Sequence, residues 1–321
     1  MKKPIFERVA IIGLGLLGGS VAAAAKRSGA AAGVAGSSRS VNAREFALRR
    51  NWVDETGSPI EAARGADLVV LATPVFAMAD VLSGLAPALS PPAIVTDVGS
   101  VKAQLAETLP GLLPSGIRYV GSHPIAGSHE RGIEYARDDL FEDAPCVVTE
   151  GEDPAAVERV CSFWRTLGAR VILRDPVTHD AQVAWTSHVP HSLAFGFAAA
   201  FRESPTGAGD LAGGGFRDFT RIAQSDPELW SDILTANRKA LAAPLAAVSR
   251  AFGELSRAIE ANDQEWVERW LSAAREALAL LAPPASPAGP PGDVHPAAET
   301  TNPRLESETR SGLESEENEN D

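Results

Sequence analysis

Cysteine, long apolar runs and basic residues are all scarce in this sequence, and each shortage argues against a class of protein. Cys146 and Cys161 are the only cysteines and lack the paired spacing of a metal site, which argues against a disulfide framework and fits a reducing cytoplasm. No apolar run reaches the ~20 residues of a transmembrane helix, so we expect no membrane association. Because Asp and Glu outnumber Lys and Arg by 42 to 29, we expect no nucleic-acid partner, which would require clustered basic residues.

The C-terminal segment, residues 283–321, is rich in proline and then in acidic residues. It holds nine Asp and Glu against two Arg, so much of the net charge of −13 is concentrated there. Such a composition buries too little apolar surface to offset the entropy lost on ordering. We therefore expect a disordered tail. The rest of the chain is long enough for two folded domains.

The first part of the chain, residues 1–175, alternates short apolar runs with helical patterns, as βαβ units do. The runs are nearly continuous in Val, Ile and Leu, which is typical of strands buried on both faces of a parallel sheet. They predict strands over residues 9–12, 33–38, 67–73, 93–99, 117–122, 144–150 and 169–175. We expect an α/β dinucleotide-binding domain with a Rossmann-type, doubly wound, mostly parallel sheet.

Residues 176–282 carry long helical patterns, with proline and glycine mainly between them. This pattern predicts a second, all-α domain. Pro190 lies inside one of the helical patterns and indicates a kink or a helix start, which would aim His191 into a cleft. We expect Trp185 and Trp230 in the core or in an interface, with a substrate platform as the alternative.

The segment VAIIGLGLLGGSVAAAA contains the G-x-G-x-x-G pattern between a predicted strand and a predicted helix. In this pattern the first glycine permits a tight turn, the second lets the backbone approach a pyrophosphate, and the third allows close helix–strand packing. The helix N-terminus faces the negative charge. The alternative is a structural glycine turn. The residues that we predict to bind a dinucleotide here are Gly13, Gly15, Leu16, Leu17, Gly18 and Thr73.

The end of the second predicted strand bears on the choice of cofactor. Enzymes that use NAD usually place Asp or Glu there to bind the ribose 2′-hydroxyl. This chain has Ser37, Ser38 and Arg39 instead. Hydroxyls and a guanidinium suit a 2′-phosphate, which a carboxylate would repel. We therefore expect NADP+ to be favoured over NAD+, unless Arg39 is only a solvated residue of the helix's first turn.

Four further motifs, together with GLGLLGGS, give the chain a resemblance to the prephenate and arogenate dehydrogenases of tyrosine biosynthesis. The motifs are DVGSVK (97–102), GSHPIAGSHERG (121–132), HDAQVAWTSHVPHSLAF (179–195) and GGGFRDFTRIAQSDPELW (213–230). The resemblance implies oxidative decarboxylation of prephenate to 4-hydroxyphenylpyruvate, or of arogenate to tyrosine, with hydride transfer to NAD(P)+. It also implies a homodimer formed through the helical domain.

The resemblance assigns catalytic roles to His123 and Ser100. His123 matches the histidine that hydrogen-bonds the ring hydroxyl of the substrate and helps to remove its proton, and Ser100 matches a serine that supports it. Histidine suits this task because its ordinary pKa of ~6.5 lies near operating pH. His123 also follows the predicted strand 117–122, where α/β sheets place their ligands. The alternative is an ordinary loop histidine.

The resemblance also assigns substrate-binding residues. His191 matches one of them, and Arg221 matches the arginine that holds a substrate carboxylate, a task for which its rigid fork is suited. Arg217 and Ser128 stand where some relatives have Lys and Thr, and both are expected to line the site. His129 departs from the pattern, because some relatives carry a glutamate there that pairs with the helical domain. We therefore do not expect that ion pair in this chain.

Other readings of these motifs are open at this point. His188 and His191 are three residues apart and would share a helix face, but no third ligand completes a metal site, so we expect no metal and a hydrogen-bonded helix position for His188. Arg221 is alternatively a solvated helix residue. A β-hydroxyacid dehydrogenase would carry a lysine on the helix that here bears His179. A non-catalytic NADP-binding sensor or scaffold would be expected to lack Ser100, His123 or Arg221, and all three are present.

Overall fold

The computed structural model describes residues 3–127 and 130–279. Contacts divide the chain into two compact units, Met1–Glu254 and a second that begins at Leu255, and each is described by itself. Ser128, His129 and the predicted tail lie outside the described residues. The predicted domain boundaries, at 175/176 and 282/283, stay predictions.

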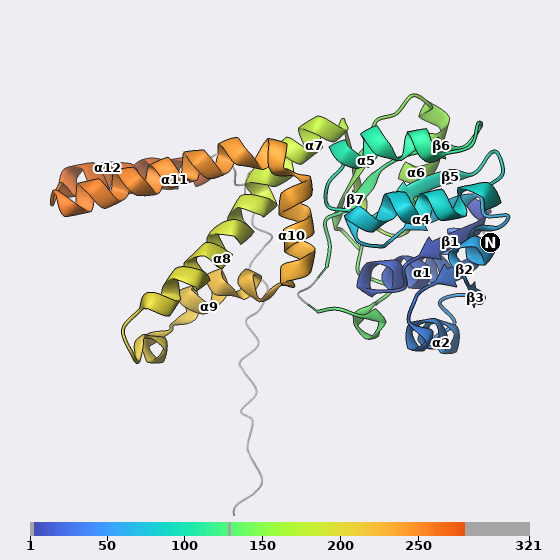
Figure 1. Ribbon diagram of the computed structural model, residues 1–321, viewed down its shortest axis with the longest axis horizontal. Helices are drawn as coiled ribbons and strands as arrows, with labels where there is room; N and C mark the ends of the chain where they lie inside the picture. The colour runs from blue at the N-terminus through green and yellow to red at the C-terminus, as the bar shows by residue number, and fades with distance from the viewer. Residues whose placement is uncertain (1–2, 128–129, 280–321) are drawn as a thin grey trace, which may run out of the picture. The chain divides into compact units, whose positions relative to one another are not determined.

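The first unit contains a six-stranded parallel sheet in the order β3-β2-β1-β4-β5-β6 (Figure 1). Its strands are β1 Phe6–Ile12, β2 Ala31–Ser37, β3 Glu55–Gly57, β4 Leu68–Leu71, β5 Ile94–Asp97 and β6 Arg118–Tyr119. This is the Rossmann-type sheet that the apolar runs predict. The apolar runs do not predict β3, because its three residues, Glu-Thr-Gly, form no such run.

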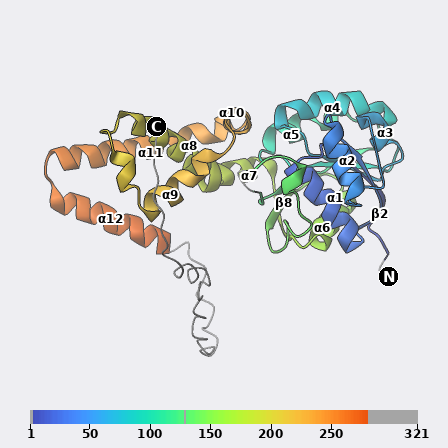
Figure 2. The ribbon, with the colours of Figure 1, turned by 90° about the horizontal axis from the view of Figure 1, so that it is seen from below.

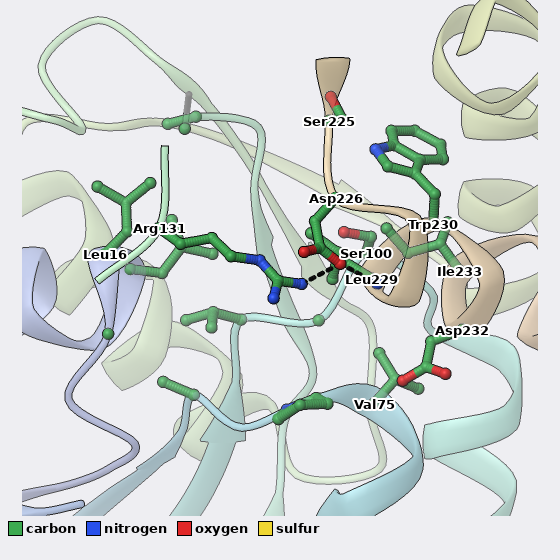
Figure 3. A pocket seen from close by; sticks show the side chains of 18 of the residues that line it. Leu16, Val75, Ser100, Arg131, Ser225, Asp226, Leu229, Trp230, Asp232 and Ile233 are labelled. Atoms are coloured by element: carbon green, nitrogen blue, oxygen red, sulfur yellow. Dashed lines mark hydrogen bonds and ion pairs between the residues drawn. The ribbon is translucent and has the colours of Figure 1, made fainter. Parts of the chain in front are cut away.

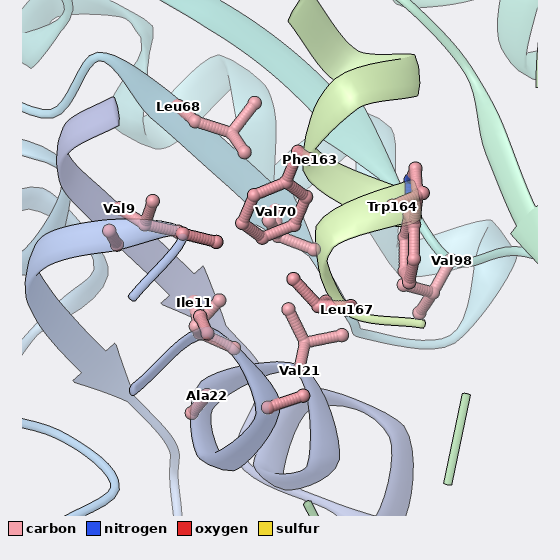
Figure 4. Packing of buried hydrophobic residues seen from close by; sticks show 14 of the residues in the cluster. Val9, Ile11, Val21, Ala22, Leu68, Val70, Val98, Phe163, Trp164 and Leu167 are labelled. Carbon is pink, nitrogen blue, oxygen red and sulfur yellow. The ribbon is translucent and has the colours of Figure 1, made fainter. Parts of the chain in front are cut away.

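Helices cover both faces of this sheet, as the doubly wound fold requires. Alternate residues of β1 face opposite cores: Val9 and Ile11 belong to one apolar cluster, and Ala10 and Ile12 belong to the other. The first cluster includes residues of α1 Leu16–Ser28, α2 Val41–Arg49 and α6 Pro154–Thr166 (Figure 4). The second includes residues of α3 Pro59–Ala63, α4 Met78–Leu85 and α5 Ala103–Thr108, which form the opposite layer (Figure 2).

A second sheet of three strands, in the order β7-β8-β9, carries His123. Its strands are β7 Ser122–Pro124, β8 Pro145–Thr149 and β9 Arg170–Arg174, with β7 antiparallel to β8 and β8 parallel to β9. The prediction of one strand over residues 117–122 is therefore wrong at its end. The chain leaves the main sheet near Val120, and Gly121 then exchanges hydrogen bonds with Thr149. His123 thus lies in a strand of a mixed sheet, beyond the parallel strand that we expected it to follow.

From Pro176 to Ala279 the described elements are all helices. They are α7 Pro176–Val183, a π-helical turn Ala184–His188, α8 Val189–Ala200, α9 Gly214–Arg221, α10 Pro227–Ala236, α11 Arg238–Glu260 and α12 Gln264–Ala279. Short 3₁₀ turns occur at Val75–Ala77, Ala86–Ala88, Pro110–Leu112, Ile133–Tyr135, Phe201–Glu203, Ala208–Leu211 and Ile222–Gln224. Pro190 lies in the first turn of α8, directly after the π turn, and the residues at these junctions keep helical dihedral angles, so the helical path continues from α7 into α8 through the π turn. None of the described helices combines the length and the apolar character needed to cross a bilayer.

Candidate active site

A cavity of about 660 Å³ lies where the carboxyl ends of β1, β4 and β5 meet α8 and α10 (Figure 3). Its volume falls within the range typical of small-molecule sites. Open α/β sheets bind ligands at this edge. The residues that line it from the sheet side include Gly15, Leu16, Leu17, Thr73, Ser100 and His123, and those from the helices include His191, Arg221 and Trp230.

The glycines of the first turn fit a dinucleotide. Gly13 has φ +113°, and a Cβ there would lie 2.4 Å from the carbonyl oxygen of Ala72. A Cβ on Gly18 would lie 1.8 Å from the carbonyl oxygen of Gly13, so the helix packs against the turn too closely for any side chain. Gly15 faces open space, with nothing within 4 Å of its Cβ position. The backbone is therefore accessible at the position where a pyrophosphate would bind.

Two unsatisfied polar groups also fit this cofactor. Gly15 is the N-cap of α1 and supplies no side-chain cap, so the first-turn N–H groups are available to an anion. Thr73 lines the cavity, and its buried Oγ1 has no hydrogen-bond partner among the described residues. The residues present therefore fit a nicotinamide dinucleotide, which Gly15, Leu16, Leu17 and Thr73 would hold.

The residues at the end of β2 do not line this cavity. Ser37 is buried, and its carbonyl accepts the N–H of Gly13. The hydroxyl of Ser38 accepts the N–H of Ser40, which caps α2. Arg39 is exposed, and no carboxylate pairs with it in the described part of the chain. A guanidinium at the end of β2 is therefore free to meet a ligand.

His123 belongs to a buried chain of hydrogen-bonding side chains. Its Nδ1 lies 2.8 Å from Nε2 of His179, and Nδ1 of His179 lies 2.8 Å from Oδ1 of Asp180. Burial lowers the pKa of His123 well below its ordinary value, and the positive charges that His179, Lys102 and His188 can carry lower it further. His123 is therefore neutral at physiological pH and has a lone pair with which to accept a proton.

His191 is held by the other wall of the cavity. Its ring stacks on Trp230 with centroids 3.7 Å apart, and its Nδ1 lies 2.9 Å from the carbonyl oxygen of Ser187. That carbonyl can only accept, so Nδ1 carries the proton and Nε2 carries the lone pair. Burial, together with the charge of Arg221, lowers the pKa of His191 although the bond to Ser187 opposes this. Trp230 is buried, as the sequence predicts. It also lines the cavity, which agrees with the alternative of a substrate platform.

His188, in the π turn before α8, has the hydrogen-bonded position that the sequence predicts. His188 is buried, and its Nδ1 accepts from the side-chain amide of Asn237, 2.9 Å away. The same amide donates to the carbonyl of Asp180. Trp185 is 52% exposed and lies outside the core. No cluster of three His, Cys, Asp or Glu side chains that could hold a metal occurs in residues 3–127 and 130–279.

The three arginines near the cavity differ in their partners. Arg221 lines the cavity, and no carboxylate pairs with it in the described chain. Arg131 forms an ion pair with Asp226, the N-cap of α10, so the loop after β7 is tied to the helical wall (Figure 3). Arg217 donates to the carbonyl of Ala212 and does not line this cavity. Of these cations, Arg221 is therefore the one available to an anionic ligand.

The sequence analysis assigned no site role to His179, Asp180, Arg131 or Asp226. The first two stand side by side at the start of the motif HDAQVAW, and that motif was the only available signal. His179 is 56 residues from His123 in the chain, so their contact depends on how α7 packs beside β7. An ionic contact such as that of Arg131 with Asp226 has no sequence signature at all.

The fold and the cavity are those of a nicotinamide-dependent dehydrogenase, and the cavity is lined by a buried histidine, His123, and by Arg221, which has no carboxylate partner among the described residues. Two family models match the chain: "Prephenate dehydrogenase, nucleotide-binding domain" over residues 21–173 and "Prephenate dehydrogenase, dimerization domain" over residues 175–273. The chain belongs to the prephenate dehydrogenase family. Its reaction is an oxidative decarboxylation in tyrosine biosynthesis, and the β-hydroxyacid and scaffold alternatives fall away.

Three similar proteins illustrate the range of this family. A cyclohexadienyl dehydrogenase of Zymomonas mobilis is 36% identical over 86% of this chain and 97% of its own length. The crystal structure of A. aeolicus prephenate dehydrogenase with hydroxyphenyl propionate and NAD+ is 30% identical, with a TM-score of 0.79 over 86% of this chain and 98% of that one. Synechocystis arogenate dehydrogenase is 34% identical, with a TM-score of 0.73 over 86% of this chain and all of that one.

Proposed function

We propose that the chain oxidises prephenate or arogenate with NADP+ in preference to NAD+, using His123 as the base and Arg221 as the carboxylate-binding residue. The observation that carries this proposal is that one cavity contains the glycine turn, His123, His191 and Arg221. The hydride acceptor, the proton acceptor and the anion-binding group are thereby brought within reach of one small substrate. A bound nicotinamide dinucleotide supplies the hydride acceptor.

His123 accepts the proton of the ring hydroxyl on Nε2, since Nδ1 is engaged by His179. Loss of that proton raises the electron density that expels the hydride from the same carbon. The ring carboxylate leaves as CO2, and the proton returns to the ring oxygen as the phenol forms. A positioned base of this kind typically contributes ~10²–10⁴-fold. Ser100 follows β5 and lines the same cavity, which supports the proposal that it assists at the ring hydroxyl.

Arg221 and His191 hold the substrate in place for this transfer. The guanidinium of Arg221 binds a carboxylate through two parallel hydrogen bonds, which fixes its orientation as well as its charge. His191 presents the lone pair of Nε2, which can accept from the ammonium of arogenate, and its ring cannot rotate because Trp230 stacks against it. These contacts hold the substrate in line with the nicotinamide. The loss of translational and rotational entropy then occurs on binding and no longer adds to the barrier of the chemical step. Ser128 and Arg217 stay predicted substrate residues.

The preference for NADP+ rests on Arg39. β2 ends without a carboxylate, and the exposed Arg39 directly precedes Ser40, the N-cap of α2. A 2′-phosphate at this point meets a guanidinium and the hydroxyl of Ser38, whereas a 2′-hydroxyl meets no carboxylate there.

A homodimer and a cytoplasmic location are also part of the proposal. The matched C-terminal family model is described as a dimerization domain. On the first unit, ring contacts join Phe197 of α8 to Phe216 and Phe219 of α9, and Phe197 and Phe219 are more than 40% exposed. Such an apolar patch fits a subunit interface. Cys146 and Cys161 are free and buried, which fits a reducing compartment.

A four-way assay tests the function directly. Prephenate and arogenate are each supplied with NAD+ and with NADP+, and reduced nicotinamide is followed by absorbance together with the aromatic product. We expect turnover of at least one acid, with a higher kcat/KM for NADP+ than for NAD+. Absence of turnover in all four arms would overturn the proposed activity, and equal use of both cofactors would overturn the role of Arg39.

A further inference from the structure

We propose that His179 and Asp180 are positioning residues that fix the tautomer of His123, so that its Nε2 lone pair faces the substrate. The inference rests on the proposed role of His123 as the base. Neither residue lines the cavity, and both are buried: His179 is 1% exposed and Asp180 is 4% exposed. They therefore act on the reaction only through the imidazole that they contact.

Asp180 anchors this arrangement because it acts only as an acceptor. Its Oδ1 accepts the backbone N–H of Lys102 at 2.7 Å, and its Oδ2 accepts that of Ala103 at 2.9 Å, at the start of α5. Oδ1 is also 2.8 Å from Nδ1 of His179. Each oxygen of Asp180 thus accepts a backbone N–H, and an ionised carboxylate can only accept, so it has no proton to give to His179.

The proton positions follow in order from this carboxylate. Nδ1 of His179 must donate to Asp180, so Nε2 of a neutral His179 carries a lone pair. That lone pair accepts the Nδ1 proton of His123, and the lone pair of His123 is then on Nε2. In the described chain Nε2 of His123 has no hydrogen-bond partner, and His123 lines the cavity. The tautomer of His123 is thus fixed before the substrate binds.

The rings are also fixed in direction. The imidazoles of His123 and His179 meet edge to face, with centroids 5.0 Å apart and an interplanar angle of 79°. His179 is on α7, His123 is on β7, and Asp180 joins α7 to the first residues of α5. When His123 takes up a proton, the imidazolium keeps a neutral acceptor at Nδ1 and a carboxylate one ring away. Carboxylate–histidine pairs orient a second group in the same way in hydrolytic enzymes and metal sites.

Two substitutions of His179 separate this role from simple packing. In His179→Gln the amide oxygen takes the place of Nε2 and still accepts from Nδ1 of His123. In His179→Asn the amide takes the place of Nδ1, so Asp180 keeps its donor and His123 loses its acceptor. We expect kcat to fall ~10–100-fold in His179→Asn and less than ~5-fold in His179→Gln, with the KM for the acid and the Kd for the cofactor changed less than ~3-fold. Equal losses in the two variants, or no loss in either, would overturn the proposal.

A double-mutant cycle distinguishes an effect of His179 on the base from an effect on packing. Once His123→Asn has removed the base, His179→Asn has nothing left to orient, so we expect no further fall in kcat. A further fall of ~10-fold in the double variant would show that His179 acts independently of His123, and would overturn the proposal.

A measurement without turnover keeps this inference separate from the proposed function. In protein labelled with ¹⁵N-histidine, long-range ¹H–¹⁵N spectra at pH 7.5 distinguish protonated from unprotonated ring nitrogens, and the His123→Asn and His179→Gln spectra assign the two rings. We expect Nδ1 protonated and Nε2 unprotonated in both. A proton on Nε2 of His123 would overturn the inference even in an active enzyme, whereas the expected pattern in a protein inactive on both acids would contradict only the proposed function.

Discussion

The ammonium of Lys102 forms an ion pair with the carboxylate of Asp97 in a position where both side chains are completely buried. The same ammonium donates to the carbonyl of Ser122, 2.8 Å away, and Asp97 also accepts from Ser122 N–H and from the hydroxyl of Tyr119. These contacts tie the end of β5 to the start of β7. They hold the strand that carries His123 against the main sheet.

Replacing one member of this pair should therefore be costly. Lys102→Met leaves the Asp97 carboxylate buried without its cation, and we expect the free energy of unfolding to fall by ~3–5 kcal/mol. Guanidinium denaturation measures it. Lys26→Met is the matched control, because the pair of Lys26 with Asp54 is partly exposed and should be worth less than ~1 kcal/mol. Similar losses in the two variants would contradict the importance of the buried pair.

His123→Asn should abolish most of the turnover. The base is lost while the glycine turn is untouched, so we expect kcat to fall by ~10²–10⁴-fold with the cofactor Kd nearly unchanged. Steady-state rates and cofactor fluorescence titration measure the two quantities. Near-normal turnover would exclude His123 as the base.

Arg221→Gln should weaken substrate binding. Loss of a charged hydrogen-bonding group typically costs ~1.5–3 kcal/mol, so we expect the KM for the acid to rise ~10–100-fold with a smaller change in kcat. Arg217→Gln is the matched comparison, since both arginines are on α9 and only Arg221 lines the cavity. An equal rise in KM for Arg217→Gln would place both residues in the site, as the sequence analysis predicted.

Arg39→Ala should discriminate between the two cofactors. We expect the Kd for NADP+ to rise ~10-fold or more because a charged contact to the 2′-phosphate is lost, and the Kd for NAD+ to change less than ~2-fold. Arg49→Ala on α2 is the control, because Arg49 is exposed and pairs with Glu45. Parallel changes for both cofactors would remove the argument for NADP+.

Acid should destabilise the protein partly through His188. Burial lowers its pKa to about 4, against the opposing charge of Asp180, while in the unfolded chain it titrates near ~6.5. Between these values the unfolded state holds a proton that the folded state lacks, so the free energy of unfolding decreases as pH falls. We expect ~2 kcal/mol from this residue between pH 7 and pH 5.

His188→Asn tests this origin, because its amide oxygen still accepts from Asn237. Denaturation at both pH values should show a loss on acidification smaller by ~2 kcal/mol in the variant than in the parent chain. His123 and His191, whose pKa values are also lowered by burial, account for part of what is left. An unchanged pH dependence would show that His188 does not carry the effect.

The sequence by itself determined the main sheet and the cofactor turn. Both depend on local signals: runs of apolar residues that form buried strands, and glycines at positions where a Cβ would collide with Ala72 or Gly13. The helices after Pro176 also follow from a local signal, the helical spacing of their apolar residues. The three-residue strand β3 escaped because it is too short and too polar to carry such a signal.

Only the tertiary structure decided how the site is assembled. The sequence identified His123 but placed it beyond a parallel strand, whereas β7 turns away to pair with β8. It could not bring His179 to that histidine, nor Asp226 to Arg131, because these contacts join residues 56 and 95 positions apart along the chain only in the folded protein. Local patterns determine the secondary structure of each segment, and packing between distant segments determines which side chains contact one another at the cavity.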